Sequence, residues 1–130
     1  MTPSEYQNPI LCADYSDPDI VRVGDDFFMV SSSFNHVPAL PILHSTDLVN
    51  WTIINHVMDE LPLPGYDRYQ PGKGVWAPSI RWHDGKLWVC FSTPDEGIFI
   101  CHTEDPWGEW SAPHCLREAR GWIDPCPFWD

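Results

Sequence analysis

The apolar residues of this 130-residue chain come in short runs that are separated by turns rich in glycine, aspartate and proline. Residues 20–23 and 27–32 are two such runs, and the residues Gly24-Asp25-Asp26 between them are typical of a β-hairpin with a three-residue turn. Elsewhere apolar positions alternate or come in fours, and prolines interrupt the chain throughout, so a helical period is almost absent. The pattern predicts an all-β protein.

The chain also repeats itself around three openings in which a residue precedes proline: Asp17-Pro18, Ala77-Pro78 and Asp124-Pro125. Behind each of the first two lie an apolar run, a polar turn and a second apolar run, with Ile20 and Ile80 at the same offset. Residues 44–51 and 102–110 echo each other as well, since each stretch begins with histidine and ends with tryptophan. Repeats of this length, made of short strands and turns, indicate β-propeller blades.

On this interpretation the chain holds two blades and the first strand of a third. The first blade is expected at about 17–57, a connection at about 58–74, the second blade at about 75–113 and the start of the third at about 121–130. Propellers have about four to eight blades, because closure removes exposed sheet edges. Residues 1–130 are therefore expected to be the N-terminal part of one longer propeller domain. A small all-β domain that is complete at Asp130 is the alternative.

Charge and composition narrow the classes of partner. Nineteen acidic against seven basic residues give a formal net charge of −12, which disfavours nucleic acid and anionic membranes. Residues 1–8 lack the basic start and apolar run of a secretory leader, and no stretch reaches the roughly 20 apolar residues of a membrane span. The five cysteines show no C-x-x-C spacing, so neither a disulfide framework nor a zinc site is expected. A cytoplasmic protein fits these features best, and its oligomeric state stays open.

Two carboxylates are the strongest candidates for chemistry. Asp17 lies directly before a proline, where the backbone is expected to be extended, and such a backbone would hold the side chain at the mouth of an inner strand. A lone Asp-Pro is more often a surface turn, but the acid recurs at Asp124 and is replaced by Ala77 in the middle unit. The repeat therefore does not need the acid in order to fold. If the inner strand of each unit begins in the same way, Asp17 and Asp124 converge near the propeller axis and form a candidate active site.

Other polar and aromatic residues have weaker claims. Asp47 and Asp105 occur in both repeats, so they are expected to cap turns. Phe34 and Trp76 have no counterpart of the same kind and lie where strands meet loops, so they would either stack on the C–H face of a neutral sugar or fill the core.

Metal binding finds little support in the sequence. The acids around Asp17 do not have the spacing of a calcium loop, and the six histidines show no paired ligand spacing. Neither a metal nor any other cofactor is assigned.

Several stretches together resemble glycoside hydrolase family 43, the β-xylosidases and α-L-arabinofuranosidases. They cover most of the chain, in order: residues 8–11 (NPIL), 15–29 (YSDPDIVRVGDDFFM), 31–34 (SSSF), 43–51 (LHSTDLVNW) and 74–80 (GVWAPSI). The resemblance implies a five-bladed propeller that acts on oligosaccharides. Its reaction would remove terminal β-D-xylosyl or α-L-arabinofuranosyl residues from plant cell-wall oligosaccharides, with inversion. A structural calcium ion in the complete propeller stays open.

The resemblance also implies roles for individual residues. Asp17 would be the general base that activates water, and Asp124 would orient the sugar and tune the pKa of the general acid. Phe34, Trp76 and Ala77 would line the sugar pocket. An inverting glycosidase needs an acid and a base about 6.5–9.5 Å apart, and a nearby carboxylate raises the pKa of the acid by like-charge repulsion. In this family the acid is a glutamate beyond the position of Asp124, so the chain alone is expected to be inactive.

Two other functions remain open at this point. A lectin-like propeller would bind sugar without cleaving it. A related clan of sucrose- or fructan-cleaving propellers uses the first-blade aspartate as a nucleophile and retains the anomeric configuration. The sequence does not separate xylose from arabinose as substrate.

Overall fold

The computed structural model describes residues 5–130 and confirms the all-β prediction, since strands are the only regular elements of this part of the chain. The eight strands are β1 (Asp19–Val23), β2 (Asp26–Val30), β3 (Ala39–Ser45), β4 (Thr52–Met58), β5 (Trp76–His83), β6 (Lys86–Thr93), β7 (Gly97–Thr103) and β8 (His114–Glu118). The expected absence of a leader concerned residues 1–8, of which residues 1–4 lie outside the described part.

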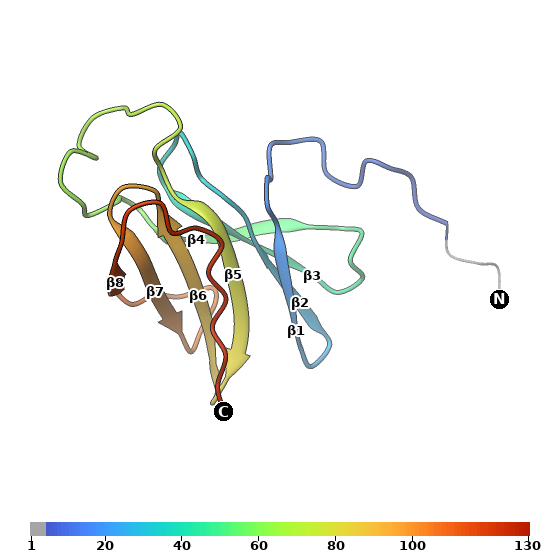
Figure 1. Cartoon of the computed structure of the whole chain (residues 1–130). Helices are drawn as coiled ribbons and strands as arrows, with labels where there is room; N and C mark the ends of the chain where they lie inside the picture. Colours follow the sequence, from blue (N-terminus) through green and yellow to red (C-terminus); the bar gives the residue numbers. More distant parts are fainter. Residues whose placement is uncertain (1–4) are drawn as a thin grey trace.

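The strands form two four-stranded antiparallel sheets, each a simple meander. Sheet 1 has the order β1-β2-β3-β4 and sheet 2 the order β5-β6-β7-β8. Figure 1 shows the two sheets as successive layers, with β1 and β2 next to β5. Consecutive four-stranded meanders that pack face on face are the building pattern of a propeller.

The first hairpin is tighter than the sequence suggested. Val23 pairs with Asp26, so the turn contains two residues, Gly24 and Asp25, and not three. Gly24 has a φ of 64°, a left-handed conformation that glycine adopts without a steric penalty. The second hairpin also has a two-residue turn, and both Asp84 (φ 49°) and Gly85 (φ 75°) are left-handed, as a type I′ turn requires.

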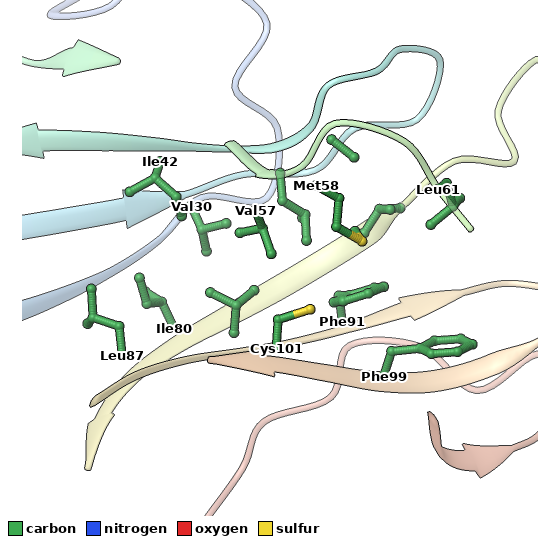
Figure 2. Close-up of a cluster of buried hydrophobic side chains, with 14 of the residues drawn as sticks. Val30, Ile42, Val57, Met58, Leu61, Ile80, Leu87, Phe91, Phe99 and Cys101 are labelled. Atoms are coloured by element: carbon green, nitrogen blue, oxygen red, sulfur yellow. The ribbon is translucent and has the colours of Figure 1, made fainter. Parts of the chain in front are cut away.

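The hydrophobic core lies between the two sheets (Figure 2). Sheet 1 contributes Val30, Ile42, Val57 and Met58, and sheet 2 faces them with Ile80, Leu87, Phe91, Phe99 and Cys101. Full burial of a large aliphatic or aromatic side chain stabilises a fold by about 1.5–3 kcal/mol. The core therefore joins the sheets to each other, and neither sheet buries its apolar face alone.

The turn acids behave as predicted. The Asp47 carboxylate accepts hydrogen bonds from the backbone N–H groups of Val49 (2.9 Å) and Asn50 (2.7 Å) and from the Asn50 side chain (2.7 Å). Its pKa is held far below its ordinary value, mainly by the Asn50 backbone and side-chain hydrogen bonds and then by that of Val49. Asp105 makes a single such bond, from the Trp107 N–H at 3.0 Å.

The cysteines are free within residues 5–130. Cys90 and Cys101 are buried, as expected for small apolar side chains in strands. Burial raises the pKa of the Cys90 thiol to about 11 and that of the Cys101 thiol to about 12. In the described part of the chain there is no helix long and apolar enough to cross a membrane.

The end of the chain differs in detail from the expected blade bounds. β8 extends to Glu118, beyond the expected end of the second unit at about residue 113, and all five of its residues are exposed. Residues 121–130 form no strand, but they run along sheet 2, as the red segment in Figure 1 shows. There Trp129 stacks on His83 with ring centroids 4.4 Å apart and lies 5.8 Å from the ring of Trp88.

Candidate active site

The three openings share an unusual backbone conformation. The φ angles of Asp17, Ala77 and Asp124 are 49°, 20° and 56°, so the expectation of an extended backbone before proline was wrong. Positive φ costs a residue other than glycine about 1–2 kcal/mol and persists only where surrounding contacts hold it. Because Ala77 adopts it without a polar side chain, the conformation comes from the strand mouth and not from the acid.

Ser32 supplies two of the contacts that hold the first opening. Its backbone N–H donates to the Ser16 carbonyl oxygen at 3.0 Å, and its hydroxyl donates to Asp17 Oδ2 at 2.9 Å. Ser32 is buried just beyond the end of β2, whereas Asp17 is exposed. The arrangement fixes a carboxylate from one side and leaves it open to water on the other.

Arg81 connects the first opening to the third. Its Nη1 donates to Asp19 Oδ2 at 2.5 Å and its Nη2 donates to Cys126 Sγ at 3.0 Å. Asp19 and Cys126 each lie two residues after a candidate acid, Asp17 and Asp124 respectively, and two residues of chain span at most about 7 Å. One guanidinium thus brings together two openings that are more than a hundred residues apart in the sequence.

Further hydrogen bonds support this junction. The Ser79 hydroxyl donates to the Pro125 carbonyl oxygen at 2.8 Å, and the Ile80 N–H donates to Asp19 Oδ2 at 2.9 Å. Partial burial by itself lowers the pKa of Arg81, but the hydrogen bond and the charge of Asp19 outweigh it and the pKa is raised. The Asp19 carboxylate therefore links the two sheets, because Ile80 and Arg81, which donate hydrogen bonds to it, both belong to β5. Within residues 5–130 no cluster of histidine, cysteine and acidic side chains could hold a metal ion.

The two predicted sugar-binding aromatics lie side by side. The rings of Phe34 and Trp76 meet edge to face with centroids 5.8 Å apart, and both side chains are partly exposed. Ser33 and Val75 form a short antiparallel bridge next to them. A side chain at Gly74 would place its Cβ 2.0 Å from the Ser33 carbonyl oxygen, so this close approach requires glycine.

A pocket of about 270 Å³ opens beside this pair under the long connection between the sheets. Phe34 and His36 line it together with Tyr66 and Tyr69. Asp17, Trp76 and Asp124 do not line it. The structure therefore brings Phe34 and Trp76 together and links the openings of Asp17 and Asp124, while the loop pocket is a separate feature next to Phe34.

The roles of Ser32 and Arg81 were not predicted from the sequence. Both left a signal: Ser32 lies in a serine run that follows an apolar run, and the residue at the equivalent position of the second unit, in β6, is again a serine, Ser92. Arg81 is one of only seven basic residues and lies in the middle of an apolar run.

Comparison with known proteins identifies the fold and the family. The profile of Glycosyl hydrolases family 43 matches residues 6–130. The chain belongs to this family. The GH43 BlXynB protein from Bacillus licheniformis superposes with a TM-score of 0.85 at 33% identity, over 96% of this chain and 27% of that protein. The residues that the family profile matches include all three openings.

Two curated relatives are similar over nearly the whole chain. A xylosidase/arabinosidase from Butyrivibrio fibrisolvens is 42% identical over 129 residues, which is 95% of this chain and 24% of that protein. The non-reducing end α-L-arabinofuranosidase BoGH43B from Bacteroides ovatus is 38% identical, over 92% of this chain and 23% of that protein. The chain thus spans about a quarter of the length of these relatives.

Proposed function

We propose that this chain forms the first two blades and the opening of the third blade of a five-bladed glycosidase that removes terminal β-D-xylosyl or α-L-arabinofuranosyl residues with inversion. The observation that carries the proposal is the Arg81 bridge, which ties the openings of Asp17 and Asp124 to one guanidinium. Family membership and the xylosidase and arabinofuranosidase relatives support the reaction class.

The chemistry assigns each residue a step. Asp17 takes a proton from water, and the water oxygen attacks the anomeric carbon from the face opposite the leaving group. The glycosidic C–O bond breaks as a glutamic acid outside this chain protonates the departing oxygen. Asp124 is the second carboxylate, which orients the sugar and raises the pKa of that glutamic acid by like-charge repulsion.

The sugar is held by the remaining predicted residues. The edge-to-face pair of Phe34 and Trp76 offers partly exposed apolar surface, on which the C–H face of a pentose can stack. Ala77 takes the place that an acid occupies in the other two openings. Its small side chain leaves room for the ring between the carboxylates.

The test is the substitution Asp17→Asn in the complete enzyme that contains this segment. Asparagine keeps the shape and the hydrogen-bond acceptor for Ser32 but not the basic lone pair, so kcat should fall by about 10²–10⁴ while sugar binding persists in calorimetry. Asp84→Asn is the matched control, because it makes the same change at a left-handed position of a hairpin turn. Equal activity of Asp17→Asn and the parent would contradict the proposal.

Two further measurements separate the alternatives. Proton NMR of the first-formed product should show the inverted anomer, and retention would favour the fructan- and sucrose-cleaving clan. A parent enzyme that binds xylose or arabinose but does not hydrolyse the p-nitrophenyl glycoside of either sugar would favour a lectin. The 130-residue chain alone should show no turnover, since it lacks the acid.

A further inference from the structure

Equivalent residues of the first two strands of each sheet lie 60 positions apart in the sequence. Ile20 pairs with Met29 in sheet 1, and Ile80 pairs with Val89 in sheet 2, so 80 − 20 and 89 − 29 both give an offset of 60 residues. The offset relates Asp17 to Ala77 at the openings. It also relates Ser32, two residues beyond the end of β2, to Ser92 near the end of β6.

The two equivalent serines differ in one respect. Ser32 donates its hydroxyl proton to Asp17 Oδ2 at 2.9 Å. The hydroxyl of Ser92 is fully buried and has no hydrogen-bond partner within residues 5–130. The position that would supply its partner is Ala77, whose side chain carries no acceptor.

An unpaired buried hydroxyl is rare, because it loses its bonds to water without replacement. Within residues 5–130 the hydroxyls of Ser31 and Thr93 are also buried and unpaired, so the unpaired Ser92 does not by itself define a carboxylate site; Ser32 differs from it in having an acid at the opening of its sheet. In sheet 1 the carboxylate is present and the hydroxyl is satisfied. Of the two equivalent serines, the one whose opening carries an acid makes the hydrogen bond, and the one whose opening carries an alanine does not.

We propose that Ser32 is a positioning residue that fixes the Asp17 carboxylate for proton abstraction, an inference that rests on the proposed function. The hydroxyl holds Oδ2, and the backbone N–H of the same residue holds the Ser16 carbonyl oxygen. Rotation of the carboxylate is thereby restricted, and the other oxygen, Oδ1, is left to accept the proton. Misplacement of a reacting group by about 1 Å can reduce a rate by about 10²-fold.

The first test uses the 130-residue chain and no substrate. Three-bond NMR couplings should show one dominant χ1 rotamer of Asp17 in the parent and in Ser92→Ala, and averaged rotamers in Ser32→Ala. A single unchanged rotamer in Ser32→Ala would overturn the proposal. Thermal unfolding of each variant shows whether the comparison is made on folded protein.

The second test is kinetic, in the complete enzyme. Ser32→Ala should lower kcat about 10- to 100-fold with little change in KM, Ser32→Thr should recover part of the loss because it keeps a hydroxyl, and Ser92→Ala should match the parent. Equal losses in Ser32→Ala and Ser92→Ala would show a merely structural role. Loss of kcat in Asp17→Asn but not in Ser32→Ala overturns the positioning role alone, whereas full activity in both overturns the proposed function as well.

Discussion

Sheet 1 and sheet 2 have the same strand order, the same pairing register in their first hairpins and a left-handed residue at each opening. They differ in the side chain at the opening and in how far the isoleucine of the first strand is covered. Sheet 1 places an acid against its buried serine, while sheet 2 places an alanine there. Sheet 2 has sheet 1 packed on the face that contains Ile80, whereas Ile20 at the equivalent position of β1 is 43% exposed.

The shared features of the two sheets belong to the repeated fold, and the differing ones to the candidate site. The features common to both sheets, such as the capped turns and the opening conformation, are those that a repeated fold needs. The features that differ, the acid at residue 17 and the aromatic at residue 34, are those from which a site can be built on that fold. Four pairs of substitutions test this division.

The largest contrast is expected in the isoleucine pair. Ile80→Ala should lower the free energy of unfolding by about 2–5 kcal/mol, because Ile80 is fully buried between the sheets and its loss leaves a cavity. Ile20→Ala in the same chain should cost less than about 1 kcal/mol, as is usual for a partly exposed site. Urea unfolding of both variants measures the difference, and equal losses would show that the two faces are covered alike.

Next comes the arginine that bridges the openings. Arg81→Ala should destabilise the chain by about 1–2 kcal/mol, since it removes hydrogen bonds to Asp19 and Cys126 that are partly screened by water. Arg22→Ala is the comparison variant: Arg22 contacts only groups of its own hairpin, namely the exposed Asp25 at 3.4 Å, the Gly24 carbonyl oxygen at 2.8 Å and the Phe27 ring, so its effect should be smaller, below about 1 kcal/mol. An Arg81 variant as stable as the Arg22 variant would remove Arg81 as a structural link.

The two equivalent serines, Ser32 and Ser92, should differ in what their replacement does to stability. Ser32→Ala should cost about 0.5–1.5 kcal/mol through the lost hydrogen bond to Asp17. Ser92→Ala should be neutral or slightly stabilising, because it removes a buried hydroxyl that has no partner. Chemical unfolding of the two variants under one set of conditions checks the sign, and a clear loss in Ser92→Ala would mean that its hydroxyl is satisfied.

The smallest effect concerns the turn acids and depends on pH. The Asp47 pKa is lowered in the folded chain, so its charge stabilises the fold above the ordinary value near 4, and this contribution is lost as the pH falls through the folded pKa. The melting temperature of Asp47→Asn should therefore lie below that of the parent at pH 7 and approach it in acid. Asp105→Asn, which loses one hydrogen bond at most, should show less change at pH 7.

Much of the fold could be read from the chain, because hairpins and capped turns depend on neighbouring residues. The hairpins around Gly24 and Gly85 and the capped turn at Asp47 follow from local turn chemistry and from apolar periodicity. β8 gave no such signal, since its five side chains are all exposed and show no apolar alternation, and its pairing with β7 makes it a strand.

The site was predictable in part. The recurrence of the acids and the single occurrence of Phe34 and Trp76 singled out the candidate residues, and the structure puts those two rings in contact; the roles of these residues stay predictions. The backbone at Asp17 was predicted wrongly, because the local preference before proline yields to contacts from Ser32 across the sheet. Neither Ser32 nor Arg81 could be assigned a role without knowing which distant groups they meet.

The order of residues was by itself sufficient for the class of fold, the repeat and the selective placement of two acids, since each of these is written in short-range pattern or in plain recurrence. Only the folded chain decided which serine has a carboxylate to hold, which isoleucine is covered and which arginine joins the first opening to the third. Those properties depend on contacts between residues about 15 to 60 positions apart, and such contacts exist only once the sheets have packed on each other.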